Sequence, residues 1–306
     1  SSHRGQLQPP PARLPPAMTN GYLFREYLGA QSTGVRFSDV PVNPGVSFHY
    51  ILAFAIDYTP VAQQPTPAPT NGVFSAFWDT ANLSRADVAA IKTAHPNVSV
   101  MAGLGGDSVL DIVKVSFAPT SVDSWVANAV ASLSRLINEY GLDGVDVDYE
   151  RFAAGVSVDT FVECVGRLLT RLKAAFPNIT TSIAPFEDDT VQRYYRALWS
   201  RYSGVIDYVN FQFYGYGANT DVPTYVMFYD RQTGFYPGAR VLASLQTGKT
   251  TEELGLLSPD QGIAAAKELL RQNKLPGFFI WSADSSKQST YKFTYETRAQ
   301  EIVANH

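Results

Sequence analysis

The ten residues GLDGVDVDYE (141–150) contain four carboxylates in a chain that is otherwise weakly charged. Valines alternate with these acids, and valine favours half-buried β-strands. Successive residues of a strand point to opposite faces, so Asp146, Asp148 and Glu150 share one face while apolar side chains occupy the other. We therefore expect a strand whose apolar face packs on helices and whose acidic face points inward.

The composition of the whole chain indicates a large, well-buried core. Of 306 residues, 45% are apolar and 17% are charged, whereas the usual charged share is about 25%. This length accommodates one large α/β barrel or two medium domains. The net charge is −4, no basic run is interleaved with aromatics, and no apolar run reaches about 18 residues. We therefore expect neither nucleic acid nor a membrane as a partner.

The only cysteine, Cys164, lies in the apolar stretch FVECVGRLL and is interpreted as a buried structural thiol. A single cysteine excludes an internal disulfide, which fits a reducing compartment without requiring one. Residues 1–19 are rich in proline and lack the apolar centre of a signal peptide. We expect a disordered arm or a leader there, followed by one domain over 20–306. The location stays open between the cytoplasm, a vacuole and secretion after removal of a signal.

Strand-like and helix-like segments alternate along the chain. Ser84 and Asp87 form a capping box ahead of one expected helix, and SPDQ at 258–261 begins another. Amphipathic helices are expected over 121–141 and 158–176. Eight apolar, β-branched runs predict strands, and they are 22–28, 48–56, 98–104, 142–149, 179–185, 206–214, 239–245 and 277–283.

Eight such units predict a single (β/α)8 TIM barrel. Two connections fit this pattern poorly, because 31–46 shows little helical periodicity and 222–236 is aromatic and irregular. A doubly wound sheet would also alternate strands and helices, but the number of strands and the length favour the barrel.

The acidic strand has the features of an acid–base site. Alternate residues lie about 7 Å apart along a strand, so three inward carboxylates repel one another and at least one should hold a proton near neutral pH. A protonated carboxyl at the C-terminal end of a strand is suited to general acid catalysis. Asp143 has the opposite parity, lies at the start of the strand and is interpreted as structural.

A solvated sheet edge or a divalent metal site would also place several carboxylates on one strand. An edge strand would not need valines on its second face. A hard cation would require further carboxylates or carbonyl ligands, and none is identifiable on the remaining strands. The histidines are scattered, with no pair at ligand spacing, and they are His3, His49, His95 and His306. We therefore expect no metal and no cofactor.

The octapeptide DGVDVDYE (143–150) resembles DGxDxDxE, the signature of glycoside hydrolase family 18, the chitinases and their relatives. The motif falls on the fourth expected strand, where that family carries it, and the resemblance extends from about residue 20 to the C-terminus. The third expected strand ends in GLGG (103–106), which is similar to the family's SxGG with Gly103 in place of serine.

Aromatic residues extend the resemblance. The sixth expected strand carries QFY (212–214), similar to plant members, and the eighth carries Trp281, where the family places a tryptophan under the bound sugar. Tyr27 and Phe54 resemble aromatics near the same subsite. The lack of disulfides separates the chain from plant class III enzymes, and it looks closer to the bulb chitinases, narbonin and concanavalin B.

The resemblance implies a mechanism in which the N-acetyl group of the substrate is the nucleophile. Glu150 would then protonate the glycosidic oxygen and later activate water. Asp148 would orient the acetamido N–H and stabilise the oxazolinium ion, Asp146 would exchange a proton with Asp148, and Tyr214 would donate to the acetamido oxygen. Trp281 would lie under the −1 sugar. The resemblance also implies substrate-binding positions at Gln212, Tyr27, Phe54, Gly105 and Gly106.

A second function is a barrel without hydrolysis, because some relatives serve as lectins, storage proteins or glycosidase inhibitors. Gly103 departs from the family pattern, and Arg25 lies on the same face of its strand as Tyr27. An arginine that reached the acids would hold Glu150 ionised, whereas a deeper position beside Asp146 would be harmless.

The presence of all three inward acids and the tyrosine favours the active enzyme. We expect a monomeric endo-chitinase in plant defence that acts on chito-oligosaccharides or exposed chitin chains. The sequence leaves open whether N-glycan cores are also substrates.

Overall fold

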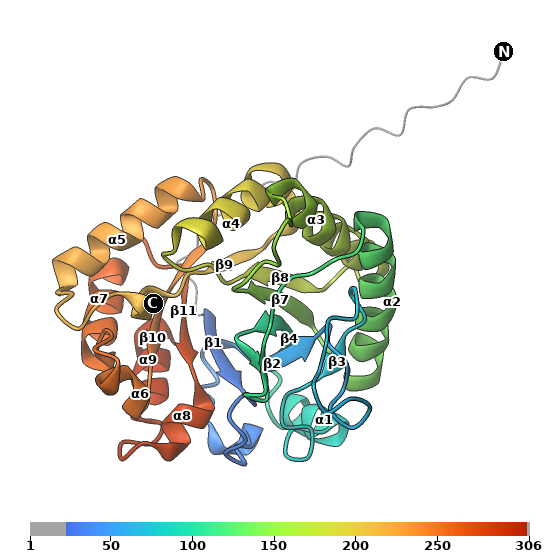
Figure 1. Cartoon of the computed structure of the whole chain (residues 1–306). Coiled ribbons are helices and arrows are strands. Elements are labelled where there is room, and N and C mark those ends of the chain that lie inside the picture. Colours follow the sequence, from blue (N-terminus) through green and yellow to red (C-terminus); the bar gives the residue numbers. More distant parts are fainter. Residues whose placement is uncertain (1–22, 305–306) are drawn as a thin grey trace.

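Eight parallel strands form a closed barrel in the computed structural model, which describes residues 23–304 (Figure 1). The barrel closes because β1 pairs with β2 on one side and with β11 on the other. The expected arm over 1–19 lies outside the described residues. The barrel strands are β1 (Leu23–Leu28), β2 (Ser47–Ile56), β4 (Val98–Gly106), β7 (Gly144–Tyr149), β8 (Thr180–Ile183), β9 (Tyr208–Asn210), β10 (Val241–Gln246) and β11 (Gly277–Trp281).

The predicted barrel is thus confirmed, and a strand overlaps each of the eight predicted runs. The sixth strand is shorter than predicted, because it ends at Asn210 and Phe213–Gly215 forms a 3-10 turn. The parallel register places Asp146 of β7 opposite Gly103 of β4 and Ser182 of β8. Because neighbouring strands run in the same direction, their C-terminal ends meet at one rim of the barrel, where TIM-barrel enzymes place their active sites.

Helices cover the outside of the barrel. The helices are α1 (Arg85–Ala94), α2 (Val122–Tyr140), α3 (Val158–Ala175), α4 (Asp189–Tyr202), α5 (Val222–Phe235), α6 (Lys249–Glu253), α7 (Pro259–Arg271), α8 (Ala283–Gln288) and α9 (Thr294–Ala304). Short 3-10 turns are η1 (Phe37–Asp39), η2 (Ser203–Val205) and η3 (Phe213–Gly215). The predicted capping boxes at Ser84 and Ser258 are both present, and Gly141 ends α2 with a φ of 65°.

The expectation that 222–236 is irregular was wrong, because α5 spans almost all of it. The side chain of Asp221 accepts a hydrogen bond from the Thr224 backbone N–H and caps the helix. Apolar side chains occur on both faces, since Tyr225 is buried while Met227 is 52% exposed. This distribution hides the helical periodicity in the sequence. The first connection contains only η1, as expected.

Asp143 lies immediately before β7 and has a structural role, as predicted. Its Oδ2 accepts a hydrogen bond of 2.8 Å from the backbone N–H of Val100 in β4, and its Oδ1 lies 2.9 Å from Lys92 Nζ in α1. The carboxylate therefore joins the start of β7 to a neighbouring strand and to an outer helix.

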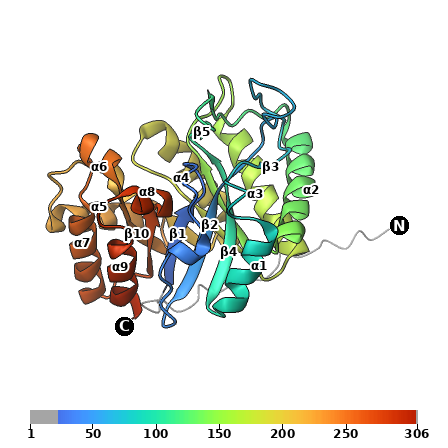
Figure 2. The same cartoon turned by 90° about the horizontal axis from the view of Figure 1, so that it is seen from below.

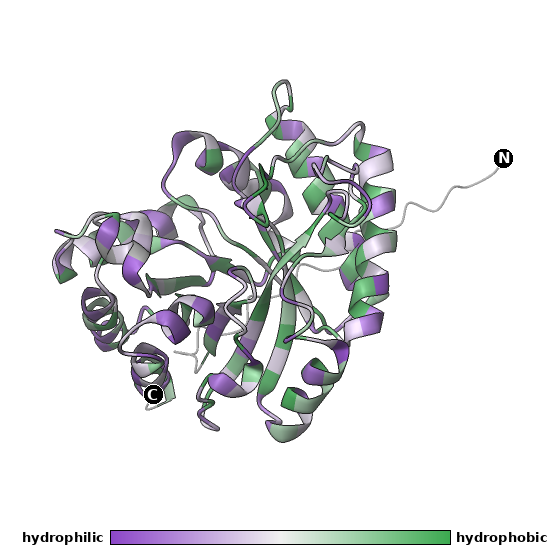
Figure 3. Cartoon of the chain, turned by 60° about the horizontal axis from the view of Figure 1, so that its bottom comes forward, coloured by the Kyte–Doolittle hydropathy of each residue, from purple (hydrophilic) through white to green (hydrophobic). Residues whose placement is uncertain are grey.

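Apolar packing fills the space between barrel and helices. In Figure 3 the strands are largely hydrophobic, while the helices alternate between hydrophobic and hydrophilic stretches. Val145 and Val147 are fully buried on the outer face of β7. Cys164 is also buried, as predicted, and burial raises the pKa of its thiol to about 12. Within the described residues, no helix combines the length and apolarity needed to cross a membrane.

Additional short strands lie at the C-terminal rim. β3 (Ser75–Ala76) pairs antiparallel with the end of β2, and β5 (Ser108–Val109) pairs antiparallel with β6 (Val113–Lys114). The hairpin of β5 and β6 follows β4 directly. Figure 2 shows β3 and β5 near the top of the molecule, at the end of the barrel where the strands finish.

Candidate active site

The inner face of β7 carries three carboxyl groups in a row. Asp146 is fully buried and Asp148 is 4% exposed. Glu150 directly follows the strand and is partly exposed at the rim. The row therefore runs from the barrel interior to the opening, and each carboxyl has a different environment.

Asp146 is surrounded by hydrogen-bond donors. It accepts hydrogen bonds from Tyr27 Oη at 2.6 Å, Ser182 Oγ at 2.7 Å and Asn210 Nδ2 at 3.4 Å. Burial raises the pKa of Asp146, but the charge of Arg25 and the hydrogen bonds from Tyr27 and Ser182 oppose this increase. These groups favour the ionised form of Asp146.

Asp148 lies between two other acids and has little to stabilise its charge. Burial raises the pKa of Asp148 well above its usual range, and the negative charges of Glu150, Asp146 and Asp107 raise it further. Gln212 Nε2 donates to Asp148 Oδ1 at 3.3 Å and only partly opposes this shift. Of the Asp146–Asp148 pair, Asp148 is therefore the member that is more readily protonated.

Glu150 is the outermost acid. Burial raises its pKa to about 7, with a contribution from the negative charge of Asp107 and opposing contributions from Arg151 and Lys114. A carboxyl with this pKa still carries its proton in weakly acidic solution, where an ordinary glutamic acid is ionised. It meets the first requirement of a general acid.

A pocket of about 300 Å³ opens above the acids. It brings together six of the residues predicted from the sequence, which come from β2, β7, β11 and the segments after β7 and β9. These are Phe54, Asp148, Glu150, Gln212, Tyr214 and Trp281. Asp146 and Tyr27 lie below the pocket, and Gly105 and Gly106 do not line it. No three His, Cys, Asp or Glu side chains in residues 23–304 are grouped so that they could hold a metal ion.

Stacked aromatic rings form one side of the pocket. Trp281 and Phe54 are nearly parallel, with ring centroids 5.7 Å apart and an interplanar angle of 18°. The ring of Tyr27 also packs against Trp281, with centroids 5.3 Å apart, and Tyr27 is only 1% exposed. Tyr27 thus supports Trp281 from beneath and binds Asp146. The ring of Tyr214 packs edge-on against Phe279.

Arg25 occupies the deeper of the two positions considered for it. Its Nη1 donates to Ser182 Oγ at 2.7 Å and to Asn210 Oδ1 at 3.0 Å, and its guanidinium lies 5.5 Å from the ring centroid of Tyr208. These partners place it below Asp146. Its charge opposes the increase in the pKa of Asp146, whereas the charges that act on Glu150 are those of Asp107, Arg151 and Lys114.

Comparison with known proteins agrees with this geometry. The family model "Glycosyl hydrolases family 18" matches residues 46–253. The chain belongs to glycosyl hydrolase family 18. It is 50% identical over 289 residues to Chitinase 1 of Tulipa saxatilis subsp. bakeri, covering 94% of this chain and 89% of that protein.

Solved structures of family 18 enzymes have the same fold. The catalytic domain of a GH18 chitinase from the fern Peteris ryukyuensis is 50% identical, with a TM-score of 0.85, covering 92% of this chain and 99% of that chain. A family 18 chitinase from Crocus vernus is 43% identical, with the same TM-score and the same coverage. The family resemblance seen in the sequence is therefore confirmed.

The departure of this family 18 chain at Gly103 is explained by packing. A Cβ atom at Gly103 would lie 2.9 Å from Cδ1 of Phe54, and one at Gly106 would collide with the same ring. Gly105 and Gly106 also have φ values of 96° and 82°, which favour glycine. The absence of side chains here gives Phe54 the space in which it stacks on Trp281.

Sequence reasoning missed several residues of the family 18 pocket. Asp107, Ser108, Leu110 and Asp111 line it from the hairpin after β4, and Gln246 lines it from the end of β10. A usable signal was present, because Asp107 and Gln246 lie at or just beyond the C-terminal ends of predicted strands.

Proposed function

We propose that this protein is a chitinase that hydrolyses β-1,4 bonds between N-acetylglucosamine units with retention of configuration. The observation that carries the proposal is the position of Glu150 in the pocket wall with a pKa of about 7, beside Asp148, whose pKa burial also raises. Glu150 donates its proton to the glycosidic oxygen and then accepts a proton from water. The similarity to plant chitinases supports this substrate class.

The substrate supplies the nucleophile in this proposal. The acetamido oxygen attacks the anomeric carbon and forms an oxazolinium ion, as in the substrate-assisted exception to the two-carboxylate scheme. Asp148 orients the acetamido N–H, and as the ion forms, the ionised Asp146 beneath it accepts the Asp148 proton and leaves Asp148 charged. Tyr214, which lines the same pocket, donates to the acetamido oxygen. The stacked Trp281 and Phe54 supply a flat apolar surface for the sugar.

Turnover distinguishes the enzyme from a carbohydrate-binding relative without activity. A fluorogenic chito-oligosaccharide should be hydrolysed, and a cello-oligosaccharide of equal length should not, because it has a hydroxyl in place of the acetamido group. Binding of the chito-oligosaccharide without turnover would favour a lectin or an inhibitor. The deep position of Arg25, away from Glu150, supports the active form.

The stereochemistry of the first product tests the mechanism itself. Proton NMR within the first minutes of reaction should show the β-anomer, because the acetamido oxygen displaces the leaving group with inversion and water then displaces the acetamido oxygen with a second inversion. An α-anomer appearing first would mean direct attack by water. The roles of Asp148 and Tyr214 would then be wrong even for an active chitinase.

A further inference from the structure

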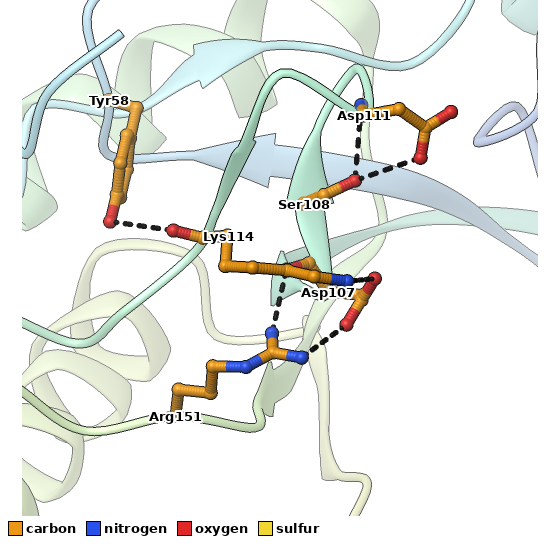
Figure 4. Close-up of polar contacts among 6 residues, drawn as sticks. All are labelled: Tyr58, Asp107, Ser108, Asp111, Lys114 and Arg151. Atoms are coloured by element: carbon orange, nitrogen blue, oxygen red, sulfur yellow. Dashed lines mark hydrogen bonds and ion pairs between the residues drawn. The ribbon is translucent and has the colours of Figure 1, made fainter.

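A cluster of three charged side chains lies at the rim of the pocket, next to Glu150. Asp107 Oδ2 is 2.8 Å from Lys114 Nζ, and Asp107 Oδ1 is 2.6 Å from Arg151 Nη2 (Figure 4). Arg151 directly follows Glu150 in the chain, and Asp107 and Glu150 line the same pocket. One carboxylate thus holds two cations that lie close to the outermost acid.

The cluster has a defined geometry because the backbone takes part in it. Arg151 Nη1 donates to the carbonyl oxygen of Asp107 at 2.8 Å, in addition to the contact with its carboxylate. The carbonyl oxygen of Lys114 accepts from Tyr58 Oη at 3.4 Å. Across the hairpin, Ser108 pairs with Lys114 in the antiparallel register. Figure 4 shows Lys114 and Arg151 approaching Asp107 from two different segments.

We propose that Asp107 is a positioning residue that holds the cations of Lys114 and Arg151 in ion pairs beside Glu150, compensates their charge, and thereby keeps this carboxyl a proton donor in weakly acidic solution. The inference rests on the proposed function. Asp107 acts through charge and does not touch the reacting atoms in this role.

Among the groups that face Glu150, this cluster carries the charges that can most readily change the pKa of Glu150. On β7, burial raises the pKa of Asp148 and favours its neutral form, and the carboxylate of Asp146 accepts hydrogen bonds from Tyr27 and Ser182. Burial raises the pKa of Tyr195 in α4 and of Tyr214 in η3 well above the usual tyrosine range, so both are neutral. The remaining charges near Glu150 are those of Asp107, Lys114 and Arg151.

Asp107 stays ionised in weakly acidic and in neutral solution. Partial burial raises its pKa, but the hydrogen bonds and charges of Lys114 and Arg151 outweigh this and lower it below the ordinary value. All three side chains are partly exposed, with Asp107 at 52%, so solvent screens their effect on Glu150. Exposed pairs of this kind shift a pKa by about 0.2 to 0.7 unit.

The test is the pH dependence of kcat/KM for chito-oligosaccharide hydrolysis. In Asp107→Asn the basic limb of this pH profile should move to lower pH by about 0.2 to 0.7 unit, because the uncompensated charges of Lys114 and Arg151 lower the pKa of Glu150. In Lys114→Met the limb should move to higher pH, because one cation is removed. Asp107→Glu should return the limb toward the wild-type position. Both shifts should shrink as salt is raised.

Asp230→Asn is the matched control, since it removes a similarly exposed carboxylate, 46% against 52% for Asp107, from an ion pair with Lys274 that does not line the pocket. Its limb should stay within about 0.1 unit of wild type, well below the shift expected of an exposed pair. An unchanged limb in Asp107→Asn, or shifts of the same sign in Asp107→Asn and Lys114→Met, would overturn the inference.

A second readout does not depend on activity. The Glu150 carboxyl can be titrated by 13C NMR in the free protein with labelled glutamate, and Glu150→Gln identifies its signal. If the wild type hydrolyses no substrate, the proposed function fails, while the opposite shifts in Asp107→Asn and Lys114→Met can still be measured. Absence of these shifts in the NMR titration would reject the role of Asp107 by itself.

Discussion

The two ends of β7 carry acidic residues with opposite properties. At the start, Asp143 is held by the Val100 N–H and by Lys92. At the end, no described side chain hydrogen-bonds the carboxyl of Glu150, and its pKa is raised to about 7. One strand therefore separates a carboxylate that stabilises the fold from a carboxyl that is available for proton transfer. The same division between the N-terminal and C-terminal ends is a general property of TIM barrels.

The difference comes from the partners and not from the residue type. A carboxylate that accepts hydrogen bonds and faces a cation is stabilised in its charged form. Burial without such partners stabilises the protonated form instead. Variants at the two ends should therefore change different measurable quantities.

The largest expected effect is the loss of hydrolysis in Glu150→Gln. The amide keeps the shape of the side chain and removes the transferable proton, so kcat should fall by about 10²- to 10⁴-fold or more. Chito-oligosaccharide binding, measured by calorimetry, should be largely kept. Wild-type rates in this variant would exclude Glu150 from the mechanism.

The wild-type pH profile should show the ionisation of Glu150 directly. Activity should fall above about pH 7, because the carboxyl with a pKa of about 7 then loses its proton, with a slope of roughly tenfold for each pH unit. A profile that is flat from pH 5 to about pH 9 would contradict a carboxyl acid with this pKa.

Stability should respond to the same proton. The pKa of Glu150 is higher in the folded chain, so the native state binds more protons and this stabilisation is lost as pH rises from about 4.5 to about 7. Over this window the Tm of the wild type should therefore decline relative to that of Glu150→Gln. If the Tm of both proteins changed with pH in the same way, the raised pKa of Glu150 would be contradicted.

At the other end of β7, Asp143→Ala should affect stability and not the pH profile. The substitution leaves the Val100 N–H without its side-chain acceptor and removes the ion pair of Lys92, which keeps only its hydrogen bond to the Gly141 carbonyl. We expect a loss of about 1 to 3 kcal/mol in the free energy of unfolding, measured by urea denaturation. If the basic limb of the pH–activity profile shifted in the folded variant, the two ends of β7 would not have the separate roles described above.

The smallest expected effect is that of Lys92→Met. The ion pair with Asp143 is about one-third exposed on both sides, and pairs of this kind contribute about 0.2 to 1 kcal/mol. The hydrogen bond from Lys92 Nζ to the Gly141 carbonyl is also lost. A loss as large as that of Asp143→Ala would show that the ion pair, and not the bond to Val100, fixes the start of β7.

Period-two alternation along 141–150 was sufficient to predict which acids share a face. The alternation of apolar strands and capped helices likewise predicted all eight barrel strands. Both patterns are local, because a strand repeats every two residues and a helix cap lies within four. The helix α5 was missed because exposed apolar side chains on its outer face conceal its period.

Contacts between distant segments were decided only by the tertiary structure. Gly106 of β4 pairs with Tyr149 of β7, so the residues that follow, Asp107 and Glu150, become neighbours at the rim. No local pattern predicts this, because it depends on which strands pair and in which register. The same holds for Gly103, whose missing side chain makes room for Phe54 from the adjacent strand β2. The sequence determined which residues face inward, and barrel closure determined which of them meet.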